Sequence, residues 1–308
     1  MDGGAGPSQP WTSADIAAAA QLACLLEVSA PKPGNVSPGR PFADMGFEDF
    51  LASAVAIGPA MAHAGERSLG VTVREALEAT ARWTRANTNL GIVLLLAPLA
   101  RAACVRGPRE ALRDALARVL ASTTVEDARE VYRAIRLAAP GGLGDAPEQD
   151  VADEPTTTLL EAMRLAAGRD DIAREYATAF ETTFETGAVE LRRLRASGYS
   201  CDDAIVQTFL MLLAARPDTH IARRAGWETS RRVSVDAQEA LDLGGVATSE
   251  GREALRRFDD RLRDPANRLN PGTTADLTTA AVFVHLLGSL LSVASAAPPP
   301  GHGLRLGL

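Results

Sequence analysis

The chain has little of what disulfide-rich, zinc-binding or nucleic-acid-binding proteins need. Among its 308 residues there are three cysteines, Cys24, Cys104 and Cys201, which lie far apart within apolar stretches. That spacing predicts neither a disulfide framework nor a zinc cluster, so we expect inert core thiols in a reducing compartment. The formal net charge of -7 argues against a nucleic-acid surface, because such surfaces usually carry a basic face.

The sequence also lacks segments typical of export or of a membrane span. Residues 1–12 show no basic start followed by an apolar run, and we expect them to form a disordered tail. The most apolar stretches, 90–100 and 280–296, are too short or carry polar residues such as His285, so they predict buried helices. Residues 297–308 are rich in proline and glycine and predict a flexible tail. We therefore expect a cytoplasmic protein without membrane contact.

Strand-like alternation of β-branched and aromatic residues is almost absent, whereas Ala, Leu, Arg and Glu recur at helical spacing. Without an internal repeat or a linker, residues 13–296 predict a single compact all-α domain of roughly 11–13 helices. Two capping boxes are expected, Thr72 with Glu75 and Thr124 with Asp127. The apolar helices at 90–105 and 274–295 could contribute to a homodimer. The expected helices cover 13–28, 47–63, 72–86, 90–105, 108–121, 125–138, 157–167, 171–185, 187–196, 202–215, 219–263 with a break at Gly244 and Gly245, and 274–295.

The first connection with chemical potential follows the first helix. Pro31 and Pro33 bracket Lys32 and stiffen the backbone, while Gly34 permits a positive φ and precedes Asn35. A lysine held in this way suits a phosphate group. Nearby carboxylates, Glu27 and Asp44, could share a Mg²⁺ ion with that phosphate. The alternative is an ordinary Pro-Gly connector with a solvated lysine.

The second connection brings Asn87, Asn89 and Gly91 together ahead of an apolar helix. Side-chain amides and free backbone N–H groups at a helix start can receive an anion or a nucleobase edge. Ordinary capping by either asparagine is the alternative interpretation.

The third connection, residues 139–151, has three glycines whose backbone can approach a ligand. Its carboxylates, Asp145, Glu148 and Asp150, are hard oxygen ligands of the kind that Mg²⁺ prefers. A long linker is the alternative, and the GK[ST] ending of a P-loop is missing.

A fourth site is residues 270–276, where Thr273, Thr274 and Asp276 open the last helix. Asp276 could bind metal or act as a base, or it could only complement the helix dipole while a threonine caps the helix. The four histidines match no zinc motif. His63 keeps a candidate role in phosphate contact because its helix follows the first connection, whereas His285 is expected in the core.

Taken in order, these segments resemble the triphosphoribosyl-dephospho-CoA synthase family from about residue 16 to residue 290. The matching segments are Glu27 with Pro31-Lys32-Pro33-Gly34, Asp44-Met45, Asn87-Thr88-Asn89-Leu90-Gly91, Gly141-Gly142-Leu143-Gly144 with Glu148 and Asp150, Pro217-Asp218-Thr219 with Arg223-Arg224-Ala225-Gly226, and Asn270-Pro271-Gly272-Thr273-Thr274-Ala275-Asp276.

The resemblance implies an all-α fold and a reaction in which ATP loses adenine while its triphosphoribosyl group moves to the ribose 2′-hydroxyl of 3′-dephospho-CoA. It implies Mg²⁺ as cofactor with ATP as co-substrate. It also implies that Lys32 and Arg223 bind phosphate and that Asn87 and Asn89 position the substrate. It also implies metal or acid-base work for Asp44, Glu148 and Asp150, with Asp276 as a base. Such a transfer needs charge stabilisation at C1′, a base for the hydroxyl and an acid for adenine.

The sequence departs from the citrate-lyase branch at two of these segments. That branch continues Pro-Lys-Pro-Gly with Leu-Val-Asp and the Asn-Thr segment with His and Lys, whereas this chain has Asn35-Val36-Ser37 and Asn89-Leu90. A related cofactor precursor or nucleotide is therefore a second candidate acceptor. An all-α Mg²⁺-dependent nucleotide phosphotransferase or hydrolase, and a noncatalytic helical nucleotide-binding protein, are the alternative functions.

Overall fold

A computed structural model describes residues 11–140 and 148–295, and within these ranges the chain forms helices and no strand, as predicted. The helices are α1 (Ser13–Ser29), α2 (Phe47–Ala56), α3 (Gly58–Ala62), α4 (Leu69–Thr80), α5 (Leu90–Val105), α6 (Leu112–Ala121), α7 (Val125–Ala138), α8 (Leu159–Ala166), α9 (Asp171–Ala177), the π-helix η1 (Thr182–Gly187), α10 (Ala188–Ala196), α11 (Cys201–Ala215), α12 (Thr219–Ala225), α13 (Trp227–Asp242), the 3₁₀-helix η2 (Gly245–Ala247), α14 (Ser249–Leu262) and α15 (Gly272–Ser295).

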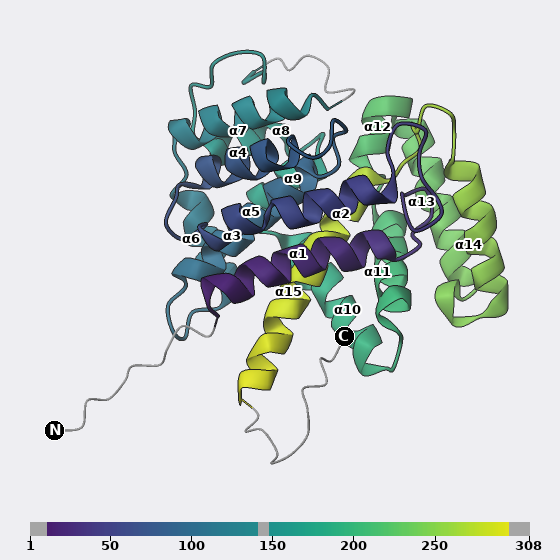
Figure 1. Cartoon of the computed structure of the whole chain (residues 1–308). Helices are drawn as coiled ribbons and strands as arrows, with labels where there is room; N and C mark the ends of the chain where they lie inside the picture. Colours follow the sequence, from purple (N-terminus) through teal and green to yellow (C-terminus); the bar gives the residue numbers. More distant parts are fainter. Residues whose placement is uncertain (1–10, 141–147, 296–308) are drawn as a thin grey trace.

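The last helix, α15, passes through the middle of the molecule, with α4, α5, α7 and α8 on one side and α12 to α14 on the other (Figure 1). It contacts α1, α5, α10, α11 and η1, so elements from both ends of the chain share one core. Its first turn, which contains the buried Thr273 and Thr274, therefore starts inside the fold.

Burial inside one chain explains the apolar sequence of α5. Its residues from Leu94 to Ala100 are all buried, and α5 packs on α1, α4, α6 and α15. Most apolar residues of α15 up to Leu287 are buried as well. The apolar residues of α5 and α15 are therefore explained by the core of a single chain. Their composition gives no support for a homodimer. Among the described helices, none is long and apolar enough to cross a membrane.

One of the two expected capping boxes is confirmed and the other is wrong. The Thr124 side chain accepts a hydrogen bond from the Asp127 backbone, and Asp127 returns the contact at the start of α7. Helix α4, however, begins one turn earlier than expected, because the Ser68 side chain caps it by accepting from Val71 N. Thr72 lies inside α4 and donates to the Ser68 carbonyl.

The structure divides three of the expected helices. Residues 47–63 form α2 and α3, with Pro59 in the first turn of α3. Residues 219–263 break at Gly226 (φ 89°) as well as at the expected Gly244 (φ 98°). In the 171–185 stretch, Ala179 and Phe180 adopt positive φ, and the chain restarts as η1. These turns depend on tertiary contacts, which helical periodicity does not show.

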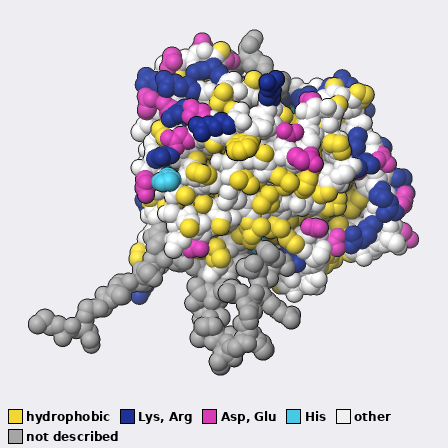
Figure 2. Space-filling view, viewed as in Figure 1, with side chains coloured by type: hydrophobic (Ala, Val, Ile, Leu, Met, Phe, Trp, Pro, Cys, Tyr) yellow, Lys and Arg dark blue, Asp and Glu magenta, His cyan; other side chains and the backbone are white. Residues whose placement is uncertain are grey.

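The expected N-terminal tail ends earlier than residue 12. Trp11 is buried and its Nε1 donates a hydrogen bond to the Leu287 carbonyl at 3.0 Å. Thr12 then caps α1 through a capping box with Asp15. On the face that Figure 2 shows, hydrophobic side chains spread over the middle, where α1 and α2 lie, and basic and acidic side chains are intermixed along the edges.

Candidate active site

The four connections singled out in the sequence converge on one cavity of about 960 Å³. The cavity lies among α1, α5, α7, α8, α9, α12 and α15, and its size is typical of small-molecule sites. The predicted site residues in its lining are Glu27, Asn35, Asp44, Asn87, Asn89, Gly91, Glu148, Asp150, Arg223, Thr273 and Asp276. Residues separated by more than 200 positions in the chain therefore face a common space.

Asp276, one turn after the start of α15 at Gly272, has the most strongly raised pKa among the carboxyl groups of the cavity. It makes no hydrogen bond or ion pair within the part of the chain that the structure describes. Burial raises the pKa of Asp276 well above its usual range, and the negative charges of Glu27 and Asp218 add to the effect. A buried carboxyl group with a raised pKa in a cavity is a candidate for proton transfer.

Lys32 lies behind the cavity wall and does not line it. Its Nζ is 3.0 Å from Glu27 Oε1, and both side chains are almost completely buried. The same ammonium donates to the carbonyl oxygens of Ala30, at 3.1 Å, and of Glu27, which lie at the end of α1. Burial raises the pKa of Glu27, and Lys32 opposes that effect. The Lys32 ammonium thus binds Glu27 and backbone carbonyl groups inside the protein. In this conformation it cannot make the expected contact with phosphate.

The rest of the first connection divides between scaffold and cavity. Gly34 (φ 76°) donates from its N–H to Asp259 Oδ1 at 2.7 Å, and a Cβ there would lie 2.8 Å from Leu262 Cδ1. Gly34 therefore allows the loop to pack on α14 and does not line the cavity. Asn35 does line it, and its Nδ2 donates to Asn270 Oδ1 at 2.5 Å. The Asn35 Oδ1 atom is buried without a hydrogen-bond partner among the described residues.

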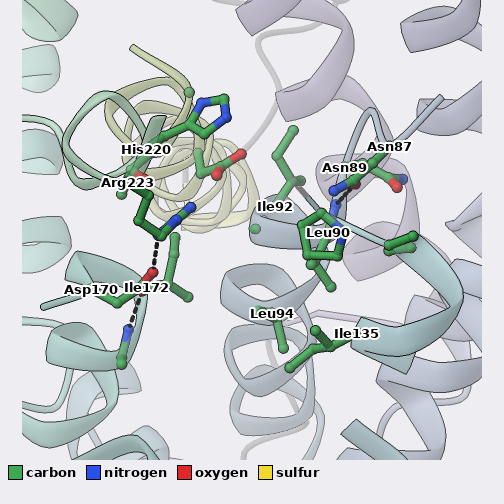
Figure 3. A pocket seen from close by; sticks show the side chains of 18 of the residues that line it. Asn87, Asn89, Leu90, Ile92, Leu94, Ile135, Asp170, Ile172, His220 and Arg223 are labelled. Atoms are coloured by element: carbon green, nitrogen blue, oxygen red, sulfur yellow. Dashed lines mark hydrogen bonds and ion pairs between the residues drawn. The ribbon is translucent and has the colours of Figure 1, made fainter. Parts of the chain in front are cut away.

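The two asparagines before α5 point toward the same side of the cavity (Figure 3). Asn87 Oδ1 accepts a hydrogen bond from Leu90 N at 3.2 Å, so it also caps the start of α5. Asn89 Nδ2 donates to Thr80 Oγ1 at 3.0 Å. Each amide thus uses one polar atom to bind a neighbouring helix, α5 for Asn87 and α4 for Asn89. The other polar atom of each amide is left for a ligand.

Arg223 and His220 face the cavity from α12, one turn apart (Figure 3). Arg223 forms an ion pair with Asp170, the residue that caps α9, and its buried Nε has no partner among the described residues. Burial and the neighbouring charges of Arg223 and Arg224 lower the pKa of His220 to about 4. His220 is therefore a neutral ring at physiological pH.

Asp218 ties α12 to α15 and so fixes Arg223 relative to Asp276. Its Oδ1 accepts from Ile221 N at 3.0 Å, at the start of α12. Its Oδ2 accepts from both the N–H and the hydroxyl of Thr274, each at 2.7 Å, at the start of α15. Thr274 is therefore a scaffold residue outside the cavity lining, whereas Thr273 lines the cavity and accepts from the Thr219 hydroxyl at 3.2 Å.

The carboxylates Asp44, Glu148 and Asp150 line the cavity from loops. Asp44 Oδ1 accepts from Asn267 Nδ2 at 3.1 Å, and Asp150 Oδ1 accepts from Ala152 N at 2.8 Å. Within the described residues, no three acidic, histidine or cysteine side chains lie close enough to hold a metal ion by themselves. The predicted Gly141, Gly142, Gly144 and Asp145 lie outside the residues that the structure describes.

His63, which we considered as a phosphate contact, lies outside the cavity. It is exposed at the end of α3, its Nδ1 lies 2.8 Å from the Pro59 carbonyl oxygen, and it is not in the cavity lining. Several cavity residues were not expected from the sequence: Asp170, His220, Arg85, Arg136, Arg169, Arg224 and Trp227. Nothing in the sequence marked these residues as ligand-binding, because isolated charged side chains such as single arginines are usually solvated.

Known proteins of one family are similar to this chain. A 2-(5''-triphosphoribosyl)-3'-dephosphocoenzyme-A synthase of Klebsiella pneumoniae is 28% identical over 303 residues, which cover 90% of this chain and 92% of that protein. A synthase of the same name from Escherichia fergusonii is 34% identical over 110 residues, 36% of each chain. The crystal structure of a candidate triphosphoribosyl-dephospho-CoA synthase from Archaeoglobus fulgidus has a TM-score of 0.60 at 29% identity and covers 77% of this chain and 97% of its own.

The match extends through nearly all of the described fold. The model of the CitG family, ATP:dephospho-CoA triphosphoribosyl transferase, matches residues 13–294, from the start of α1 almost to the end of α15. All the loops that build the cavity fall within this range. The chain therefore belongs to the ATP:dephospho-CoA triphosphoribosyl transferase family.

Proposed function

We propose that the cavity transfers the triphosphoribosyl group of ATP to the ribose 2′-hydroxyl of 3′-dephospho-CoA, with release of adenine. The observation that carries the proposal is the meeting of Arg223, Asp276 and the two asparagines in one cavity of a chain from this family. In this reaction the bond between C1′ of ATP and N9 of adenine breaks, and its electron pair leaves with adenine. The 2′-oxygen of the acceptor bonds to C1′, while its proton leaves to a base.

The arginines of the cavity suit the triphosphate. Arg223 is held in place by Asp170, and its donors face a space that Arg224 also lines. A guanidinium binds phosphate oxygens through paired, charge-assisted hydrogen bonds. Since Lys32 is bound to Glu27, we assign the main phosphate contact to Arg223.

Asp276 suits the proton transfer. Its raised pKa makes it a stronger base than an ordinary carboxylate once it is ionised, and it has no competing partner among the described residues. We assign it the proton of the acceptor hydroxyl. The amides of Asn87 and Asn89 are assigned to the edge of the adenine ring, because an amide offers both a donor and an acceptor.

The carboxylates of the cavity fit a Mg²⁺ ion that arrives with ATP. Mg²⁺ in such sites takes one or two protein carboxylates and completes its shell with phosphate oxygens and water, so three clustered ligands are not required. Asp44, Glu148 and Asp150 are the residues that would hold it. When bound, the ion neutralises phosphate charge. We propose a reducing cytoplasm as the compartment, which fits three cysteines that form no disulfide.

The test is incubation of the purified protein with ATP, Mg²⁺ and dephospho-CoA, followed by chromatography of the bases and nucleotides. The proposal predicts free adenine, formed only when dephospho-CoA is present, and far slower adenine release by an Asp276→Asn variant. Formation of ADP, AMP or phosphate without adenine would reject the proposal and favour a phosphotransferase or hydrolase. A protein that binds ATP but changes no substrate would be a noncatalytic binding protein.

A further inference from the structure

The cavity has an apolar branch that the transfer step does not use. Its surface is formed by Leu94, Ile135 and Met163, from α5, α7 and α8, over the fully buried Val131 and Leu159. Ile172 of α9 borders it on the side of Asp170 and Arg223 (Figure 3). Figure 3 shows Leu94 and Ile135 together at an end of the cavity away from Asn87 and His220. No charged group is among these six side chains, so this branch is chemically distinct from the polar centre around Arg223.

The apolar branch continues to the surface between α7 and α8. Leu137 and Leu165 line the cavity there, with exposed fractions of 49% and 52%. Large apolar side chains left half exposed at the edge of a cavity are typical of a binding surface, since covering them is favourable. Two arginines, Arg136 and Arg169, line the cavity on the same helices or directly after them. The mouth of the branch therefore combines apolar and cationic groups.

We infer that this branch binds the pantetheine arm of the acceptor, an inference that rests on the proposed function. The arm is a long, uncharged chain in which methylene and gem-dimethyl groups alternate with two amides and a hydroxyl. It therefore suits an elongated apolar groove that opens to water, where the amides can hydrogen-bond, next to cations for the diphosphate that the arm joins. The branch supplies the groove, and Arg136 and Arg169 lie where the diphosphate would pass. A chain also needs a groove that opens to solvent, as this one does at Leu137 and Leu165.

The adenine ring of either substrate fits this branch less well. A purine needs hydrogen-bond partners along its edge, and the six apolar side chains offer none. The hydroxyl of Tyr132, the lining residue next to Val131 in α7, already donates to the Gln149 carbonyl at 2.7 Å. Polar amides that could meet a purine lie instead at Asn87 and Asn89.

The test compares two ligands, dephospho-CoA and ADP, by calorimetry. ADP contains adenosine and a diphosphate but no arm. Its affinity should therefore not depend on the apolar branch, whether it binds in the place of ATP or in that of the acceptor nucleotide. The double variant Leu137→Gln/Leu165→Gln makes the mouth polar without emptying the core. We expect it to weaken dephospho-CoA binding about 5- to 20-fold and ADP binding less than about twofold. Leu243→Gln, at a residue 46% exposed and outside the cavity, is the matched control and should change neither.

Equal losses for both ligands, or no loss for dephospho-CoA, would overturn the inference. The adenine-release assay decides the proposed function separately. If adenine is released and the double variant does not discriminate between the ligands, only the arm site is wrong. If the double variant discriminates and no adenine is formed, the arm site stands and the proposed transfer is wrong.

Discussion

The carboxyl group of Asp276 in α15 lies directly against Gly91 in the first turn of α5. A Cβ atom placed on Gly91 would be 2.0 Å from Asp276 Oδ2, far inside van der Waals contact. Only a residue without a side chain leaves room for the carboxyl group in this position. Two connections that are 185 positions apart in the sequence therefore depend on each other at the centre of the cavity.

Replacing Gly91 by alanine should move the Asp276 carboxyl group and leave the fold intact. An aspartate side chain can rotate away, so we expect a stability change below about 1 kcal/mol. The misplaced base should lower kcat about 10- to 100-fold, because proton transfer depends on short distances. Steady-state adenine release and a thermal melt measure the two effects. Gly168→Ala is the control, since a Cβ there meets nothing within 4 Å. Wild-type activity of the Gly91 variant would disprove the role of this contact.

The acidic limb of the pH profile should belong to Asp276. Because the pKa of Asp276 is raised well above 3.8, the ionised form that acts as base is lost at a higher pH than for an ordinary aspartate. kcat/KM should therefore fall about tenfold per pH unit below the raised pKa and level off above it. Asp276→Asn should lose about 10²- to 10⁴-fold in kcat and show no such limb. A limb that survives in this variant would assign the titration to another group.

Arg223→Ala should raise KM for ATP strongly, whereas the free energy of unfolding should change little. Loss of a charge-assisted contact with phosphate costs about 1.5–3 kcal/mol, which corresponds to about 10- to 100-fold in affinity. Binding of ATP by calorimetry and KM from adenine release both report it. Arg252→Ala serves as the control, because Arg252 pairs with Asp203 on the surface, outside the cavity. Equal ATP affinity in both variants would show that Arg223 does not bind the triphosphate.

Lys32→Met should damage the fold and not the binding of ATP. It leaves the buried Glu27 carboxylate without its cation, which typically costs about 3–5 kcal/mol. The double variant Lys32→Met/Glu27→Gln should recover a large part of this loss in urea unfolding, since no uncompensated charge remains. If Lys32→Met instead raised KM for ATP as Arg223→Ala does, with little loss of stability, Lys32 would contact phosphate as its sequence suggests.

Local signals in the sequence were sufficient for the all-helical fold and for four of the loops that line the cavity. Helical periodicity and capping residues predicted α5 and α7 with their observed bounds. Dense Gly, Pro, Asn and carboxylate content marked four connections that reach the cavity, but not the α8–α9 connection with Arg169 and Asp170. These are properties of residues close in the chain, which sequence patterns report well.

Side-chain direction could not be predicted, because it depends on partners far away in the chain. The Pro-Lys-Pro-Gly segment suggested an exposed lysine, but Lys32 turns inward to a carboxylate five residues earlier and to the end of α1. Thr274 looked like a ligand residue, but Asp218, 56 positions away, takes both its donors. The same long-range packing places His220 and Asp170 in the cavity, although nothing in their local sequence marks them.

Mass spectrometry of the acceptor tests the central claim most directly. After reaction with ATP and Mg²⁺, dephospho-CoA should gain the mass of one triphosphoribosyl group, and ATP labelled in its ribose should pass the label to the same product. Asp276→Asn should give almost none of this product. Dephospho-CoA that keeps its mass while ATP is converted to ADP or AMP would contradict the account.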